Sequence, residues 1–237
     1  MTVTSSGGRV FVALDTVDVG RAAALAGRLK GVVGGVKLGK EFFTANGPQG
    51  VERVSAAGLP VFLDLKFHDI PNTVAGAVRA ALALKPFMLN VHASGGAAMM
   101  RAAVDAAAEA GDDRPLMLAV TVLTSLDADD LKATGVAGAV SEQAARLASL
   151  AEDCGMDGVV CSAFEAGMLR QRLGPDFKLV VPGVRPVWAS ADDQKRIMTP
   201  AEAVNAGADY LVVGRPITGA VDPVKAAEKI AAELASA

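Results

Sequence analysis

Short apolar runs alternate along the chain with longer stretches that are amphipathic or rich in alanine. The apolar runs are continuous and lack the polar–apolar alternation of a sheet with one solvated face, so both faces of each strand are expected to be buried. The expected strands are residues 9–14, 32–38, 59–63, 87–92, 116–122, 158–161, 177–181 and 210–213.

A helical pattern follows each of these strands. Asp18 is placed to cap the first helix, and Pro71 suits the first turn of the third. The expected helices are residues 19–30, 48–57, 71–84, 97–110, 140–154, 163–173, 200–206 and a last one that ends near Leu234.

Eight alternations of strand and helix in 237 residues predict an α/β fold, a single (β/α)8 TIM barrel. A doubly wound open sheet is the competing architecture, but no Gly-x-Gly-x-x-Gly motif follows the first strand. We expect residues 9–237 to form one domain, the barrel, and residues 1–8 to form a flexible N-terminal tail.

Composition narrows the classes of function. The net charge of -3 argues against a nucleic-acid binder, and no apolar run approaches the length that spans a membrane. The first residues lack the pattern of a signal peptide, so a cytoplasmic protein is expected. The two cysteines, Cys154 and Cys161, and the two histidines, His68 and His92, form no metal-ligand pattern and are expected to be structural.

Polar residues gather where the expected strands end. In a barrel the carboxyl ends of all strands form one rim, and that rim holds the active site. The residues that fall there are the ionisable Asp15, Lys37, Asp64, Lys66, Arg185 and Arg215, together with Thr124 and Gly214. Chance placement of so many ionisable groups at one rim is improbable, so the pattern predicts a functional site, with a structural ion-pair cluster as the alternative.

The stretch from Asp64 to Thr73 carries the densest chemistry. Asp64 and Lys66 are two residues apart on a strand and are expected to share a face, while Asp69 follows the strand end. Burying two carboxylates and an ammonium group costs free energy unless these charges pair with one another or bind a ligand. A metal ion between Asp64 and Asp69 is disfavoured, because Lys66 would repel it.

The end of the last strand suits a phosphate group. Backbone N–H groups of Gly214 and Arg215 open a helix and stand beside a guanidinium group. Barrels often bind phosphate after strands seven and eight, and Arg185 ends the seventh strand. A polar loop with Gln194 follows it and is expected to fold over the bound phosphate.

The ten residues from Asp64 to Thr73 resemble the signature of the orotidine 5'-phosphate decarboxylase family, in its bacterial form. The likeness extends to residues 13–15, 36–39, 121–125, 182–185, 193–194 and 213–218. The core Asp-x-Lys-x-x-Asp is shared with sugar-phosphate enzymes, whereas the full ten residues together with the Gln194 loop are much more specific.

This resemblance implies decarboxylation of orotidine 5'-monophosphate (OMP) to uridine 5'-monophosphate (UMP), the last step of de novo pyrimidine synthesis, without metal or cofactor. Lys66 would donate a proton to C6 of the pyrimidine. Asp64 would lie against the leaving carboxylate, and Lys37 would hold the ribose and Asp64.

The resemblance also assigns the remaining binding residues. Asp15 would contact the ribose, and Thr124 would lie near the pyrimidine or ribose. The phosphate would be held by Arg185, Gln194, Gly214 and Arg215. A homodimer with shared active sites is implied, in which the residues that enter the partner's site are Asp69, Ile70 and Thr73.

Two alternatives remain at this point. One is a Mg²⁺-dependent relative that acts on another sugar phosphate, such as a keto-gulonate-phosphate decarboxylase or a hexulose-phosphate synthase. The other is a catalytically silent barrel that binds a nucleotide. Activity that survives a chelator would exclude the first, and turnover of any substrate would exclude the second.

Overall fold

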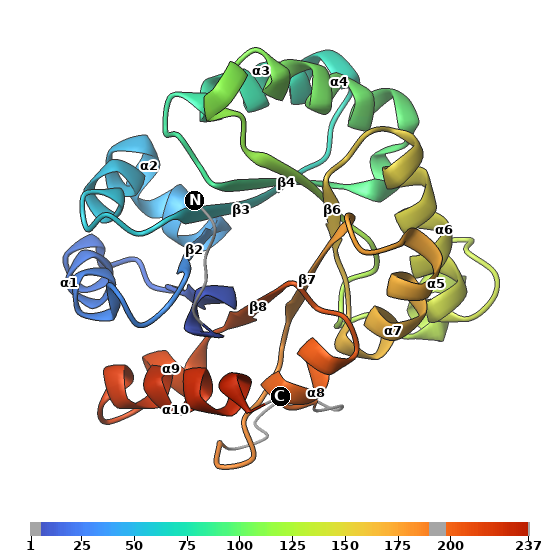
Figure 1. Ribbon diagram of the computed structural model, residues 1–237. Coiled ribbons are helices and arrows are strands. Elements are labelled where there is room, and N and C mark those ends of the chain that lie inside the picture. Colours follow the sequence, from blue (N-terminus) through green and yellow to red (C-terminus); the bar gives the residue numbers. More distant parts are fainter. Residues whose placement is uncertain (1–5, 190–197, 237) are drawn as a thin grey trace.

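The computed structural model describes residues 6–189 and 198–236, and in this part of the chain eight parallel strands close into a barrel. Each strand pairs with its sequence neighbours, and the last pairs with the first, so the predicted (β/α)8 barrel is confirmed (Figure 1). The strands are β1 (Val10–Ala13), β2 (Gly35–Gly39), β3 (Val61–Phe67), β4 (Met88–His92), β5 (Leu116–Val120), β6 (Gly158–Val160), β7 (Lys178–Pro182) and β8 (Tyr210–Val213).

The helices form a ring around this barrel (Figure 1). They are α1 (Val19–Leu29), α2 (Lys40–Ser55), α3 (Pro71–Leu82), α4 (Ala97–Ala108), α5 (Ala128–Ala133), α6 (Val140–Asp153), α7 (Ala163–Leu173), α8 (Pro200–Asn205), α9 (Arg215–Thr218) and α10 (Pro223–Ala235). Short 3-10 turns are η1 (Ser6–Arg9), η2 (Ala93–Gly95) and η3 (Gly111–Asp113). Within the described residues, no helix is long and apolar enough to cross a membrane.

Local signals explain several of the helix starts. Asp18 caps α1 as expected, accepting a hydrogen bond from the backbone N–H of Arg21 at 2.9 Å. Pro71 lies in the first turn of α3. Backbone N–H groups of a first turn have no acceptor within the helix, so proline, which lacks an N–H, loses no hydrogen bond there. Ser162 caps α7 in a capping box with Glu165.

The apolar core has two layers, which is why the strands are apolar on both faces. The larger layer fills the space between the strands and the helices. The smaller layer fills the inside of the barrel and consists of Phe11, Ala13, Phe62, Met88, Leu118, Val120, Val160, Val180 and Val212. Because this inner layer plugs the barrel, the space above it is a cavity with an apolar floor.

The predicted flexible tail over residues 1–8 is wrong for its last three residues. Ser6 to Arg9 form the turn η1, which packs against α10, and Gly7 and Gly8 are buried. A Cβ at Gly7 would lie 2.2 Å from the carbonyl oxygen of Val32, so only glycine permits this approach. Residues 1–5 lie outside the described part of the chain.

Two helical predictions also need correction. The second helix begins at Lys40, eight residues before the expected start, and contains a break at Gly47, whose φ is 62°. Pro48 therefore starts only the second half of α2. The loop before residue 140 contains α5, which Asp127 and Asp130 begin with a capping box.

Candidate active site

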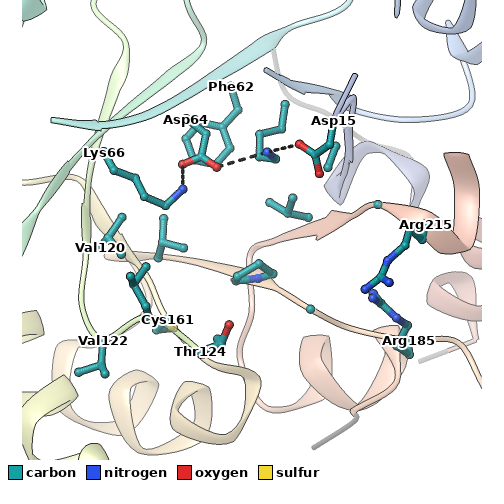
Figure 2. Close-up of a pocket in the computed structure, with 18 residues that line it drawn as sticks. Asp15, Phe62, Asp64, Lys66, Val120, Val122, Thr124, Cys161, Arg185 and Arg215 are labelled. Atoms are coloured by element: carbon teal, nitrogen blue, oxygen red, sulfur yellow. Dashed lines mark hydrogen bonds and ion pairs between the residues drawn. The ribbon is translucent and has the colours of Figure 1, made fainter. Parts of the chain in front are cut away.

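A cavity of about 340 Å³ lies at the rim formed by the carboxyl ends of the strands (Figure 2). It contains eight of the residues predicted for the site, namely Asp15, Lys37, Asp64, Lys66, Thr124, Arg185, Gly214 and Arg215. Its walls also include Ala13, Phe62, Val120, Val122, Leu123, Val160, Cys161, Pro182, Gly183 and Val212. The barrel therefore brings together polar groups that are up to 200 residues apart in the sequence.

Four charged side chains of alternating sign form a chain across one side of this cavity. Lys66 Nζ lies 2.5 Å from Asp64 Oδ1, and Lys37 Nζ lies 3.4 Å from Asp64 Oδ2. The same Lys37 Nζ lies 3.1 Å from Asp15 Oδ1. The prediction that Asp64 and Lys66 share a face of their strand is confirmed, because the two side chains meet in the cavity.

Asp64 is the centre of this chain. Burial alone would raise the pKa of its carboxyl group, but the positive charges of Lys37 and Lys66 oppose that effect, as do hydrogen bonds from Lys66 and Asn90. The net result is a pKa below the ordinary value, so Asp64 is a carboxylate at neutral pH. Each of its oxygens faces one ammonium group.

The backbone at Lys66 is unusual. Its φ is 51°, in the left-handed region that residues with a side chain seldom adopt. Its N–H donates a hydrogen bond of 2.7 Å to Oδ1 of Asn90, and Nδ2 of the same amide donates one of 2.7 Å to Asp64 Oδ1. The sequence analysis did not predict Asn90 as part of the site. The signal that could have pointed to it is a lone amide side chain within the apolar strand β4.

Two arginines in the cavity lie apart from this row of four alternating charges. Arg185 follows β7 and is buried, while Arg215 is the first residue of α9, with Gly214 at the N-cap position. Figure 2 shows their guanidinium groups pointing toward each other. The planar, forked donor groups of arginine match the geometry of phosphate oxygens.

Comparison with known proteins identifies the family. The model of the orotidine 5'-phosphate decarboxylase / HUMPS family matches residues 8–230. The chain belongs to this family.

Relatives in the family match over nearly their whole length. A protein from Rhodospirillum rubrum, named orotidine 5'-phosphate decarboxylase, is 63% identical over 95% of this chain and 93% of its own. A protein of the same name from Paramagnetospirillum magneticum is 57% identical over 95% of this chain and 97% of its own. The crystal structure of orotidine 5'-phosphate decarboxylase from Lactobacillus acidophilus superimposes with a TM-score of 0.84 at 37% identity, over 95% of this chain and 98% of that one.

Three residues that the family signature assigns to a partner's site do not line this cavity. Asp69, Ile70 and Thr73 lie at the turn between β3 and α3 and at the start of α3, and all three are exposed. Asp69 Oδ1 accepts a hydrogen bond from the N–H of Ile70 at 2.6 Å. Gln194, one of the four residues expected to hold the phosphate, lies outside the described residues.

The two histidines lie beside the site and not in it. The ring centres of His68 and His92 are 5.7 Å apart, and neither residue lines the cavity. Burial, followed by the charges of His68, Lys40 and Lys66, lowers the pKa of His92 to about 4. His92 is therefore neutral at pH 7.

The apolar wall of the cavity was not predicted as part of the site. Cys161, expected to be a core residue, is buried and also lines the cavity. Burial raises the pKa of its thiol far above the ordinary value, so it contributes a neutral surface. Among the described residues, no group of three or more His, Cys, Asp or Glu side chains is placed to hold a metal ion.

Proposed function

We propose that this protein is a carbon–carbon lyase that decarboxylates OMP to UMP, the last step of de novo pyrimidine synthesis, without a metal or organic cofactor. The observation that carries the proposal is the alternating chain Lys66–Asp64–Lys37–Asp15 at the rim of the barrel. Relatives at 63% and 57% identity bear the name of this enzyme, which supports the same assignment.

The charges of the cavity suit such a substrate. OMP carries a carboxylate on its ring and a phosphate at the other end of the molecule. Four cationic and two acidic side chains among the described residues line the cavity, a formal excess of two positive charges. The phosphate would bind at Arg185, Gly214 and Arg215, and the pyrimidine would lie near Lys66 and Thr124, with apolar walls excluding water.

Lys66 would act on the carbon that loses carbon dioxide. When the bond from C6 to the carboxyl group breaks, its electron pair stays on C6. The ammonium group of Lys66, held in a site that excludes water, stabilises this charge and then transfers a proton to C6. The amine that remains recovers a proton from solvent after UMP leaves.

Asp64 and Lys37 would prepare this step. Asp64 is ionised and faces Lys66, so it stands where the substrate carboxylate must enter. Repulsion between two carboxylates is relieved when carbon dioxide departs, which favours the transition state over the bound substrate. Lys37 neutralises the other side of Asp64 and, with Asp15, would hold the ribose hydroxyl groups.

The phosphate site would contribute to the rate although it is remote from the reacting carbon. Binding energy at Arg185 and Arg215 fixes the nucleotide in register with Lys66, so part of it is realised in the transition state. We propose Gln194 as a further phosphate ligand on the loop after β7.

The active enzyme would be a homodimer with shared sites. Asp69, Ile70 and Thr73 lie on the exposed turn that follows β3, and Ile70 leaves 67% of its surface exposed. A partner that covers this turn would bury Ile70 and receive Asp69 at its own active site. The barrel, from residue 9 to residue 237, would be the single catalytic domain of each subunit.

The test is the absorbance of OMP in the ultraviolet, followed with purified protein in the presence and absence of a chelator. Chelator-insensitive loss of the substrate band, with UMP as product, is expected. The description of the matching family pairs orotidine 5'-phosphate decarboxylase with HUMPS. The alternative named above, a sugar-phosphate relative, would need Mg²⁺. Turnover of a sugar phosphate with added Mg²⁺ and none of OMP would overturn the proposal.

A further inference from the structure

Asn90 is a polar side chain in the middle of an apolar strand. It is fully buried in β4 and does not line the cavity, so it cannot touch a bound substrate. Both ends of its amide are used: Oδ1 accepts from Lys66 N–H at 2.7 Å, and Nδ2 donates to Asp64 Oδ1 at 2.7 Å. The orientation of the amide is fixed, because a backbone N–H only donates and a carboxylate only accepts.

The strand opposite Asn90 is irregular at this point. Leu63 pairs with Leu89 and Phe67 with Val91, so four steps along β3 correspond to two steps along β4. Two extra residues of β3 bulge out of the ladder, and Lys66 in this bulge has its φ of 51°. The bulge removes Lys66 N–H from the regular ladder, and the side chain of Asn90 supplies the acceptor that the backbone of β4 does not.

The same amide also orients the carboxylate of Asp64. Oδ1 of Asp64 receives two donors, Lys66 Nζ at 2.5 Å and Asn90 Nδ2 at 2.7 Å, which leaves Oδ2 facing Lys37. Rotation of the carboxylate would break both hydrogen bonds at once. One rigid group therefore sets the backbone from which Lys66 extends and the anion that its ammonium group meets.

We propose that Asn90 is a positioning residue that holds Lys66 and Asp64 in their reactive arrangement. The proposal rests on the proposed function, because it concerns the same decarboxylation. Asparagine has the required length. A glutamine would need room for one more methylene group in a close-packed interior, and an alanine would leave the partly buried N–H of Lys66 without its acceptor. With Asn90 removed, the left-handed backbone of Lys66 loses its support, and the distance from Nζ to the substrate changes.

A purely structural role for Asn90 makes a different prediction. Loss of a buried hydrogen-bonding group would then lower stability but leave the kinetics of the folded protein unchanged. Thr121 provides a matched control. It is buried, its Oγ1 donates to the carbonyl oxygen of Val160 at 3.2 Å, and it lies outside the cavity lining.

The experiment compares Asn90→Ala, Asn90→Asp and Thr121→Val with the unchanged protein. Asn90→Asp keeps an oxygen for Lys66 N–H but replaces the donor to Asp64. For both Asn90 variants we expect kcat for OMP to fall about 10- to 100-fold while KM changes less than about threefold. Loss of the donor should also move the acid limb of the kcat/KM profile to higher pH. Thr121→Val should leave both constants near their original values.

A kcat within about threefold of the unchanged protein in folded Asn90→Ala would overturn the inference. If that variant does not fold, Asn90→Asp decides by the same criterion. A second readout does not depend on turnover: hydrogen exchange at the Lys66 amide should become faster in Asn90→Ala but not in Thr121→Val. If the unchanged protein does not act on OMP, the proposed function is wrong. If hydrogen exchange at the Lys66 amide is the same in Asn90→Ala as in the unchanged protein, the positioning role of Asn90 is wrong, whatever the substrate.

Discussion

Lys66 Nζ lies 2.5 Å from Asp64 Oδ1, and the lysine reaches this point from a backbone with a φ of 51°. A non-glycine residue in this region costs on the order of 1–3 kcal/mol, and such residues cluster at functional sites. The surrounding structure holds the strained residue through Asn90 on one side and the Asp64 carboxylate on the other. The strain and the ion pair therefore belong to one arrangement, centred on Asp64.

The carboxylate of Asp64 should stabilise the folded protein. Asp64→Asn keeps the shape of the side chain but leaves Lys37 and Lys66 without the anion between them, so the free energy of unfolding at pH 7 should fall by about 3 kcal/mol. Because the pKa of Asp64 is lowered in the folded state, its contribution is present above the unfolded pKa of 3.8 and is lost as the pH falls through the folded value. Urea unfolding at pH 7 and below pH 3.8 measures both effects. If the free energies of unfolding of the unchanged protein and of Asp64→Asn differed by the same amount at both pH values, the stabilising role of the ionised Asp64 would be contradicted.

Arg215→Ala tests the phosphate site. Loss of a charged hydrogen-bonding group should lower kcat/KM for OMP about 100-fold and weaken UMP binding, while binding of uridine, which lacks the phosphate, stays the same. Arg172→Ala is the matched control, because Arg172 is an exposed arginine on α7 outside the cavity lining. Equal losses for UMP and uridine would show that Arg215 acts on something other than phosphate.

Shared sites can be tested by mixing two inactive variants. Lys66→Ala and Asp69→Ala subunits that exchange at random should give heterodimers in which one site is intact. Because half of the dimers are mixed and each has one complete site, about a quarter of the original activity should return. Each variant incubated alone is the control. If the activity of the mixture does not exceed the summed activities of the two variants incubated alone, each active site is built from one chain.

His92 provides a prediction about pH. The folded pKa of about 4 lies below the ordinary 6.5, so the unfolded chain binds the proton first and stability should rise with pH between these two values. The chain has only two histidines, so proton NMR can follow each imidazole, with His92→Gln assigning the signals. A midpoint near 6.5 for His92 would refute the prediction.

The sequence allowed the barrel and most of the charged site to be predicted, because both depend on local patterns. The predicted helix at Ala163–Leu173 and the predicted strand at Tyr210–Val213 have the observed bounds. The expected second helix began at residue 48, so the start of α2 was missed; the chain passes from one helix into another across Gly47.

Other features depend on relationships that no short stretch of sequence contains. The role of Asn90 follows from a register shift between β3 and β4, and its partners are 24 and 26 residues away. The apolar wall that includes Phe62 and Cys161 has the same composition as the core and becomes part of the site only through closure of the barrel. The burial of Gly7 depends on a close approach to Val32, which is remote in the sequence.

The most direct test of the central claim compares the unchanged protein with Lys66→Ala in one OMP assay, after treatment with a chelator. The unchanged protein should convert OMP to UMP and carbon dioxide at a rate that the chelator does not alter. Lys66→Ala should fold and bind UMP but lose at least about 10⁴-fold in kcat, because both the stabilising charge and the proton are gone. Turnover by Lys66→Ala close to that of the unchanged protein would contradict the account.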